Sequence, residues 1–477
     1  MLFTSINFVV LVIGTFILYY LVRSKRSQVG VLLVASIVFY ASSSPWLTTL
    51  LLVSALFTSW SSFAIQQTKD SRRRRVIALV GVLLNLAVLL FFKYAGLLVK
   101  SLESLTGFSF SGAEWLVMFP LPIGISFYTF QGISMLVDTF RDTNVSSTEH
   151  KISHSGETLE ESLYFGSFYV IFFPQLVAGP VVKAKDFFPQ IRVKSVSQVD
   201  WRLVIHSLII GFFLKLVVAN NLQNQTFWIE YPYIVGMSAD RAWSLLIGYS
   251  CQIFADFAGY SLIAIGIAAL FGYRLPDNFN YPYLSVTIAE FWRRWHISLS
   301  SWLKDYLYIP LGGNRRGSFR TYCNLLIVMT LGGLWHGAAW SYLVWGAYHG
   351  LLLGIERMLG LGKINKGSKF RIFQTSFRYF LVFLLVSLGW SFFKLPDIKH
   401  ASLFIYQAFT AWESGVSQKK ELLVVFVYCL PIALYHFNSK LDLTKKYPFI
   451  VPVAYGIMLY MIVVNRASAD AFIYFQF

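Results

Sequence analysis

Residues Val29–Thr68 read VGVLLVASIVFYASSSPWLTTLLLVSALFTSWSSFAIQQT, without a single Asp, Glu, Lys or Arg. A membrane-spanning helix needs roughly 20 apolar residues, so this stretch is long enough for two passes. Small polar residues and a proline interrupt it at Ser42–Pro45, where a turn between the two passes is expected. The stretch therefore predicts a helical membrane protein.

The rest of the chain repeats this pattern. Of the 477 residues, 56% are hydrophobic and 13% are charged, whereas a soluble protein carries about 25% charged residues. Other apolar segments include Met1–Val22, Trp115–Val137, Ser162–Val182 and Thr321–Ile355, and more start near Val76, Leu203, Trp243, Tyr379, Leu422 and Phe449. At roughly 20 residues per pass, we expect an all-α, polytopic protein of about 11–13 transmembrane or re-entrant helices, in one membrane domain over residues 1–477.

The net charge of +17 would suggest nucleic-acid binding in a soluble protein. In a membrane protein, however, lysine and arginine collect in cytoplasmic loops. The basic clusters here are Arg23–Arg26, Arg72–Arg75, Arg357–Arg371 and Lys440–Lys446. Alternating passes place all four clusters in the cytoplasm if both termini face outward. We therefore expect membrane lipid, and no nucleic acid, as a partner of this surface.

A polar, aromatic insert at residues 273–322 interrupts the apolar pattern. Its centre, Glu290–Gly313, reads EFWRRWHISLSSWLKDYLYIPLGG, which is too polar to span a membrane and too aromatic for a free loop. The apolar side chains recur at roughly helical spacing, at Phe291, Trp295, Ile297 or Leu299, and Trp302. The cationic side chains fall elsewhere, at Arg293, Arg294 and Lys304. We predict short amphipathic helices folded into the membrane, because non-helical backbone is tolerated at that depth only where protein or water covers it.

Histidine is the candidate for acid–base chemistry, because a Walker loop, GxSxG, HExxH and a glycosidase-type carboxylate pair are absent from the sequence. An imidazole, with an ordinary pKa near 6.5, can take and return a proton at neutral pH. Of the eight histidines, three lie in distinctive sequence: His296 in the insert, and His336 and His349 in the helical segment 321–355. Four others lie in or beside polar segments that suggest loops and are predicted to be surface residues: His150, His154, His400 and His436. His206 is predicted to be structural.

His336 lies in LGGLWHGAAW, residues 331–340, where Gly333 and Gly337 have the GxxxG spacing that lets another backbone approach closely. From position alone, a structural histidine bonded to a facing helix and a catalytic histidine are equally good interpretations. If the segment is one helix, His336 and His349 lie about 140° apart around it and are not expected to share a metal ion. The three cysteines show no metal-ligand spacing either.

Five motifs occur in order along the chain: Leu121–Arg141, Phe173–Lys183, Gln252–Gly266, Glu290–Gly317 and Leu331–Gly337. Together they resemble the membrane-bound O-acyltransferase (MBOAT) family, and are most similar to its branch that acetylates alginate, peptidoglycan and other envelope glycans. The resemblance runs from Met1 to about Arg357. It implies an MBOAT fold with a central funnel or tunnel, and acyl transfer within the membrane.

The resemblance also implies roles for individual residues. His336 is then the catalytic histidine, a general base, and His296 is the second polar position of the site, where other branches often carry Asn. The donor is acetyl-CoA or another acyl thioester, bound as a substrate, with no tightly bound cofactor and no metal. Donor phosphates would be attracted by the cationic side chains of Arg293, Arg294, Arg315 and Arg316, with Trp295 lining the passage. Positive-inside topology is the alternative explanation of these arginines.

The sequence therefore predicts an O-acyltransferase, most simply an O-acetyltransferase, of the bacterial inner (plasma) membrane, with both termini outside. The acceptor would be a cell-envelope polysaccharide, or a periplasmic or extracellular acetyltransferase partner that completes the transfer. Leu262 stands where the alginate branch often has Asp, and the branch that transfers D-alanine to teichoic acids is also apolar there. A D-alanyl transferase fed by a carrier-protein thioester therefore stays an alternative. A transporter or scaffold is the alternative from a different class, although the two matched halves of a transporter are not visible.

Overall fold

The computed structural model describes residues 1, 3–108, 120–142, 158–177, 179–361, 371–412, 419–441 and 446–465. Within these ranges the chain is helical and contains no strand, only an isolated antiparallel bridge between Phe279 and Trp295. It divides into two compact units, one of Met1–Leu208 with Ile263–Pro276 and the other of Ile209–Leu262 with Asp277–Phe477. The expected all-α class is confirmed, and a single domain over residues 1–477 stays a prediction.

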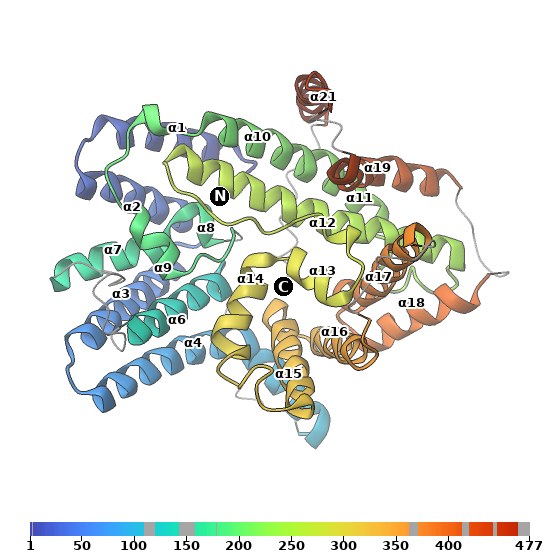
Figure 1. Cartoon of the computed structure of the whole chain (residues 1–477), viewed down its shortest axis with the longest axis horizontal. Helices are drawn as coiled ribbons and strands as arrows, with labels where there is room; N and C mark the ends of the chain where they lie inside the picture. The colour runs from blue at the N-terminus through green and yellow to red at the C-terminus, as the bar shows by residue number, and fades with distance from the viewer. Residues whose placement is uncertain are drawn as a thin grey trace. The chain divides into compact units, whose positions relative to one another are not determined.

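The first unit is built from helices that lie alongside one another. They are α1 (Ile6–Leu21), α2 (Lys25–Ala41), α3 (Pro45–Gln67), α4 (Ser71–Thr106), α6 (Ile125–Asp142), α7 (Leu159–Ile171), α8 (Phe173–Leu176), α9 (Ala184–Phe187), most of α10 (Trp201–Phe212) and the end of α12 (Ala239–Leu270). Helix α3 packs against α4, α6 and α7, and α4 also packs against α6 (Figure 1). The turn expected at Ser42–Pro45 is present, and Pro45 begins α3, where a helix does not need its missing N–H.

The second unit combines long helices with the short ones of the insert. Its elements are a π-helical turn η4 (Phe213–Ala219), α11 (Asn220–Thr226), most of α12, α13 (Ile288–Arg294), α14 (Ile297–Leu303), a second π-helical turn η6 (Lys304–Tyr308), α15 (Ser318–His336), α16 (Trp340–Met358), α17 (Arg371–Lys394), α18 (Ile398–Thr410), α19 (Lys419–Leu441) and α21 (Ile450–Val464). The short helices predicted for the insert are α13 and α14. Burial follows the predicted faces: Phe291, Trp295 and Leu299 are buried, and Arg293 is exposed.

Six helices in the described ranges are long and apolar enough to cross a membrane, by length and composition. They are Pro45–Gln67, Ser71–Thr106, Trp201–Thr226, Ala239–Leu270, Ile372–Lys394 and Glu421–Leu441, and α1 and α21 are shorter apolar helices. Large apolar side chains remain exposed on them, such as Leu79 and Leu83 of α4 at 56% and 53%. Such a surface is stable in lipid and not in water, so the chain is a polytopic membrane protein.

Residues 321–355 do not form the single helix considered above. Helix α15 ends at His336, and α16 begins at Trp340 and packs back along α15. Glycines make this close approach possible, because a Cβ on Gly333 would lie 2.9 Å from Gly346 Cα, and one on Gly337 would collide with the Tyr342 ring. The close approach predicted from the GxxxG spacing is confirmed, and its partner is the second half of the same segment.

Candidate active site

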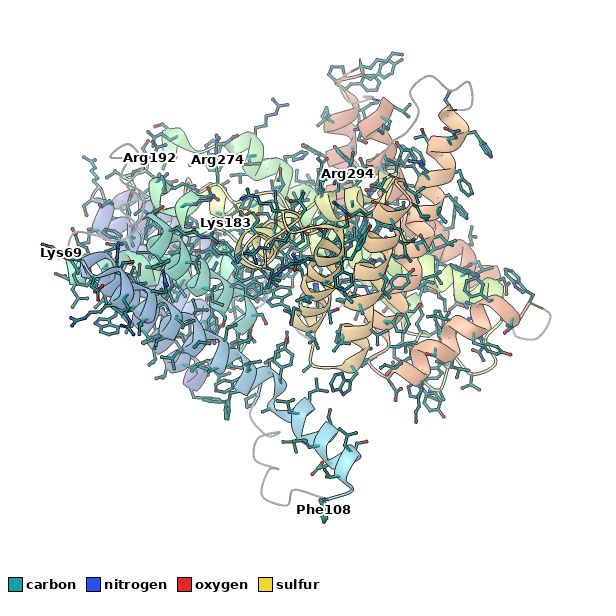
Figure 2. All side chains as sticks on the ribbon, turned by 60° about the horizontal axis from the view of Figure 1, so that its bottom comes forward. Lys69, Phe108, Lys183, Arg192, Arg274 and Arg294 are labelled. Atoms are coloured by element: carbon teal, nitrogen blue, oxygen red, sulfur yellow. The ribbon has the colours of Figure 1, made fainter. Side chains whose placement is uncertain are left out.

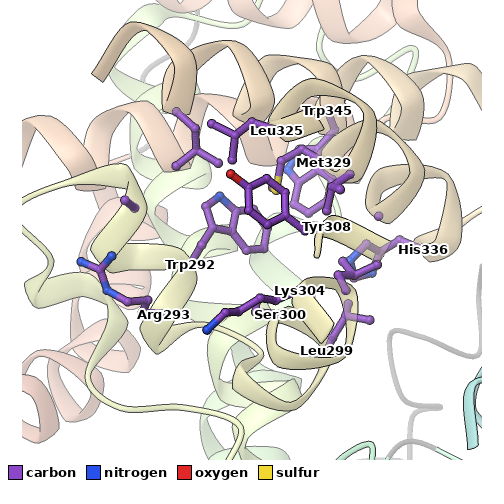
Figure 3. A pocket seen from close by; sticks show the side chains of 15 residues that line it. Trp292, Arg293, Leu299, Ser300, Lys304, Tyr308, Leu325, Met329, His336 and Trp345 are labelled. Atoms are coloured by element: carbon purple, nitrogen blue, oxygen red, sulfur yellow. The ribbon is translucent and has the colours of Figure 1, made fainter. Parts of the chain in front are cut away.

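A cavity of about 260 Å³ lies within the second unit. Residues of α13, α14 and η6 line it together with residues of α15 and α16 (Figure 3). Its wall is mostly aliphatic and aromatic, and the polar side chains in it are Arg293, Ser300, Lys304, Tyr308 and His336. An apolar cavity with a few polar groups is typical of a small-molecule site.

His336, the last residue of α15, lies in the wall of this cavity and is 4% exposed. Its ring centroid is 5.0 Å from that of Trp335, 5.1 Å from that of Trp345 and 5.3 Å from that of Phe393. Figure 3 shows His336 and Arg293 at opposite ends of the cavity. Among the lining residues, His336 is the one whose ordinary pKa lies near neutrality. It is therefore the candidate general base of the cavity.

His296 occupies a sharp corner between α13 and α14. Its φ of 44° and ψ of 54° place it in the left-handed region, which costs about 1–2 kcal/mol for a residue with a side chain. Backbone strain of this kind persists only where the surroundings impose it, and it is concentrated at functional sites. The corner brings the His296 ring centroid to 6.4 Å from that of His336.

The His296 ring is 1% exposed and packs edge-to-face on Phe257 at 4.5 Å between centroids. Within the described part of the chain, neither ring nitrogen has a hydrogen-bond partner. Burial lowers the pKa of His296 to about 3, so the ring is neutral at physiological pH. A neutral imidazole keeps one N–H, which is a hydrogen-bond donor for a substrate oxygen. His296 lies behind the cavity and is not among its lining residues.

Asn278 holds the corner that carries His296. The buried Asn278 accepts a hydrogen bond from Ile297 N on its backbone oxygen at 2.9 Å, and one from Ser298 Oγ on Oδ1 at 2.6 Å. Its Nδ2 donates to Ser261 Oγ of α12 at 2.9 Å. Sequence reasoning missed Asn278, because one asparagine in a loop carries no signal until its partners are known.

Glu356 of α16 joins two walls of the cavity. Its carboxylate accepts hydrogen bonds from the backbone N–H groups of Ile288 and Ala289, the latter at 3.2 Å. These are the first N–H groups of α13, which have no partner inside the helix. The bonds anchor α13, with Trp292 and Arg293, to the helix that carries Trp345.

The four arginines expected to bind donor phosphates do not lie together. Arg293 is exposed and lines the cavity. Arg294 donates from Nη2 to Glu290 Oε1 at 2.7 Å and is one quarter exposed. Arg315 and Arg316 are exposed in the segment before α15 and are not among the lining residues. The geometry thus favours Arg293, and the phosphate role of the four stays a prediction.

Trp295 also lies outside the cavity wall. It is 1% exposed and packs against Phe291 and Trp390, with ring centroids 5.5 and 5.0 Å away. The indoles that line the cavity belong to Trp292 and Trp345, whose buried Nε1–H groups have no hydrogen-bond partner in the described residues. The role expected of Trp295 in donor binding stays a prediction. The sequence alone does not single out Trp292. The face of α13 on which Trp292 lies is known only once the helix is seen to end at Arg294.

His349 and His436 are buried outside the cavity. His349 of α16 is 0% exposed, and its ring centroid lies 5.1 Å from those of Trp292 and Trp345. The prediction that His436 lies at the surface is wrong, because it is 3% exposed within α19. The sequence beside it is helical up to Leu441, although its polar composition suggested a loop. His150 and His154 lie outside the described residues.

A buried ion pair joins α12, the helix of Phe257, to the π-helical turn η4. Asp256 Oδ1 is 2.6 Å from Lys215 Nζ, and both side chains are less than 5% exposed. Gly259 allows the approach, because a Cβ there would lie 2.9 Å from Lys215 N. From its place in the apolar stretch DFAGYS, Asp256 is predicted either to orient a histidine or a basic side chain or to form a buried structural pair. Its partner is the basic Lys215, which fits both the orientation of a basic side chain and the structural pair.

Comparison with known proteins places these features in a family. Residues 125–362 match the family described as MBOAT, membrane-bound O-acyltransferase. The chain is 37% identical over 449 residues to a protein of Pseudomonas putida named "Probable alginate O-acetylase". This alignment covers 91% of this chain and 86% of that protein. It is 33% identical to the "Peptidoglycan O-acetyltransferase" of Helicobacter pylori, over 82% of this chain and 75% of that protein. It is 30% identical to the "Teichoic acid D-alanyltransferase" of Bacillus subtilis, over 48% of this chain and 58% of that protein.

The match to the P. putida protein extends over nearly the whole chain, and the family match contains both His296 and His336. The expectation of an enzyme, and of an acyltransferase rather than a transporter or a scaffold, is thereby confirmed. The chain belongs to the membrane-bound O-acyltransferase family.

Proposed function

We propose that this protein transfers an acetyl group from a thioester donor such as acetyl-CoA to a hydroxyl of a cell-envelope polysaccharide, or to a partner protein that completes the transfer outside the membrane. The observation that carries the proposal is the position of His336 in the wall of an apolar cavity whose opposite end is formed by the cationic Arg293. A base at one end and a cation at the other suit a donor with a reactive thioester and a distant phosphate.

The cavity wall supports a donor of this chemical class. A pantetheine-like arm is largely apolar and contains amide oxygens, which accept hydrogen bonds. The indole N–H groups of Trp292 and Trp345 lie in the wall and have no acceptor in the described part of the chain. Buried donors without an acceptor are unfavourable by about 1–3 kcal/mol each. A ligand that supplies acceptors would remove this cost.

The proposed reaction needs one base and one donor of a hydrogen bond. His336 takes the proton of the acceptor hydroxyl as its oxygen attacks the thioester carbonyl carbon. The negative charge that develops on the carbonyl oxygen accepts a hydrogen bond from the neutral His296 ring. The carbon–sulfur bond then breaks, the ester remains on the acceptor, and the imidazolium of His336 returns the proton to the leaving thiolate. No other reactant is required.

Two relatives favour acetyl transfer to an envelope glycan. The proteins named alginate O-acetylase and peptidoglycan O-acetyltransferase match more than four fifths of the chain. The D-alanyltransferase of B. subtilis matches less than half of it. Transfer of D-alanine remains the second candidate, because Leu262 follows the pattern of that branch. A location in the bacterial inner membrane with both termini outside completes the proposal.

Mass spectrometry of envelope polysaccharides tests the proposed function. A strain that lacks this protein should lose O-acetyl esters from one polysaccharide class, and expression of the wild-type chain should restore them. D-alanyl esters that disappear and return in their place would establish the second candidate. Unchanged O-acylation of every envelope glycan in the deletion strain would contradict both.

Arg293→Gln tests the use of a phosphate-bearing donor. We expect the KM for acetyl-CoA to rise about tenfold with little change in kcat, because loss of one charge-assisted phosphate contact removes about 1.4 kcal/mol of binding. Arg294→Gln is the matched control, since it removes the same charge from a side chain that already bonds to Glu290. Arg294→Gln should lower the amount of folded protein and change the KM for acetyl-CoA less than Arg293→Gln does. Equal KM increases in both variants would assign the arginines to general electrostatics or topology.

A further inference from the structure

A second cavity, of about 590 Å³, lies within the first unit and is lined by polar and cationic groups. Its cationic side chains are Arg192, Lys194 and Arg274, and Gln190, Ser195 and Gln198 contribute further polar groups. Figure 2 shows Arg192 and Arg274 beside each other at the surface of the molecule. None of the three cations has a carboxylate partner within the described residues. The cavity thus concentrates positive charge without an internal counter-charge.

Lys194 is the buried member of this group. The residue is 8% exposed, and its ammonium nitrogen lies 5.1 Å from the centroid of the Tyr273 ring. Burial, followed by the neighbouring guanidinium groups of Arg192 and Arg274, lowers the pKa of Lys194 to about 8. A buried cation is stable only with a compensating partner. An anion in the cavity would be such a partner.

Two glutamine side chains hold the backbone on both sides of the cavity. The buried Gln28 of α2 accepts from Lys194 N at 2.9 Å and donates to Lys194 O at 2.8 Å. Gln190 makes the same reciprocal pair with Arg274, accepting from its N at 2.7 Å and donating to its O at 3.1 Å. Gly272, at φ 75°, leaves room for the lysine stem, because a Cβ there would lie 3.0 Å from Lys194 Cδ. The cations are therefore presented on a preorganised backbone.

The cavity lies beside the ends of two candidate membrane spans. One span begins at Trp201, just after the lining segment 189–198, and the other ends at Leu270, just before Gly272 and Arg274. Tyr273 N bonds back to Ala268 O at 3.0 Å, which keeps this segment at the end of the helix. Trp201 is 45% exposed, and tryptophan is enriched where a span enters the headgroup layer. A bilayer crossed by both spans would therefore place the cavity beside its headgroup layer.

We propose that this cavity binds the phosphate of an anionic phospholipid headgroup. Arg192, Lys194 and Arg274 supply charge and donors for the phosphate oxygens, and the exposed apolar residues Val193 and Trp201, next to the lining segment in sequence, would contact the lipid chains. A free phosphate offers the same oxygens and lacks the chains. The site does not depend on the proposed acyl transfer.

Native mass spectrometry of the full-length protein tests this site. We expect the wild type, purified in detergent, to retain phosphatidylglycerol in preference to phosphatidylcholine. Arg192→Gln with Arg274→Gln should weaken retention about tenfold or more, since each cation near an anionic headgroup contributes about 1 kcal/mol. This pair of changes leaves Lys194 and the backbone contacts of both glutamines in place, so folding, checked by gel filtration, should be preserved.

Arg72→Gln with Arg75→Gln is the matched control, because it removes two exposed cations from the start of α4 in the same unit. It should retain phosphatidylglycerol as the wild type does. Equal losses in both double variants, or no preference for phosphatidylglycerol, would overturn the proposal. In a parallel arm with inorganic phosphate alone, binding as tight as that of the lipid and equally sensitive to the Arg192 and Arg274 changes would assign the site to a free phosphate and overturn the lipid assignment.

Discussion

His336→Gln is expected to abolish envelope O-acylation while the protein still inserts and accumulates. Glutamine can form a hydrogen bond in this position but cannot take a proton, so the variant should lose about 10²–10⁴-fold in rate, the usual contribution of a general base. His336→Ala should fail to the same degree. O-acetyl esters on envelope glycans, measured by mass spectrometry and normalised to the amount of membrane-inserted protein, provide the readout.

His349→Gln is the matched control for this experiment. Both histidines are buried and both lie against Trp345, but only His336 lines the cavity. The control should lower the amount of folded protein and retain activity per molecule. A structural role of His336 would instead appear as partial rescue by glutamine relative to alanine. Near-normal acetylation in His336→Gln would remove the proposed mechanism.

His296→Gly is expected to lower kcat by about 10²–10³-fold, the cost of losing one oxyanion donor. Glycine adopts the left-handed backbone of this position without strain. The variant therefore removes the imidazole and preserves the corner between α13 and α14. The kcat of the purified enzyme, compared at saturating donor, measures the loss.

His296→Asn separates the hydrogen bond from the ring. Asparagine tolerates a positive φ better than most residues and carries an N–H donor, so this variant should recover much of the activity that glycine loses. A wild-type kcat in His296→Gly would restrict His296 to packing against Phe257. An equal loss in the Asn and Gly variants, with both proteins folded, would indicate that the imidazole itself is needed.

Composition was sufficient to predict the class of this fold. Uncharged runs such as Val29–Thr68 have few stable alternatives to a helix in lipid, because every backbone polar group must then be bonded within the segment. Local turn residues were also sufficient to predict the break between two helices at Ser42–Pro45, where proline starts α3. These signals are local in the chain and need no knowledge of distant contacts.

The candidate site was predicted only in part. His296 and His336 are distinctive in sequence, and the structure brings their rings to 6.4 Å. The left-handed corner at His296 was not predictable, because it depends on Asn278 and, through it, on Ser261 of α12. The helical pattern of residues 290–305 gives no sign of a break, since its apolar spacing is satisfied by one helix or by two.

The sequence by itself determined that the chain is a helical membrane protein and that its aromatic insert forms short helices. It also showed two histidine motifs that resemble those of one enzyme family. Only the tertiary structure decided which side chains line the cavity. Arg293 and Arg294 are neighbours in sequence, yet Glu290 engages Arg294 while Arg293 lies in the cavity wall. The Glu290–Arg294 pair is local, four residues apart on α13, but the cavity wall that Arg293 joins depends on the reversal between α15 and α16 and on the capping of α13 by Glu356. Both bring together residues far apart in the chain, and their packing energies are not encoded in any local pattern.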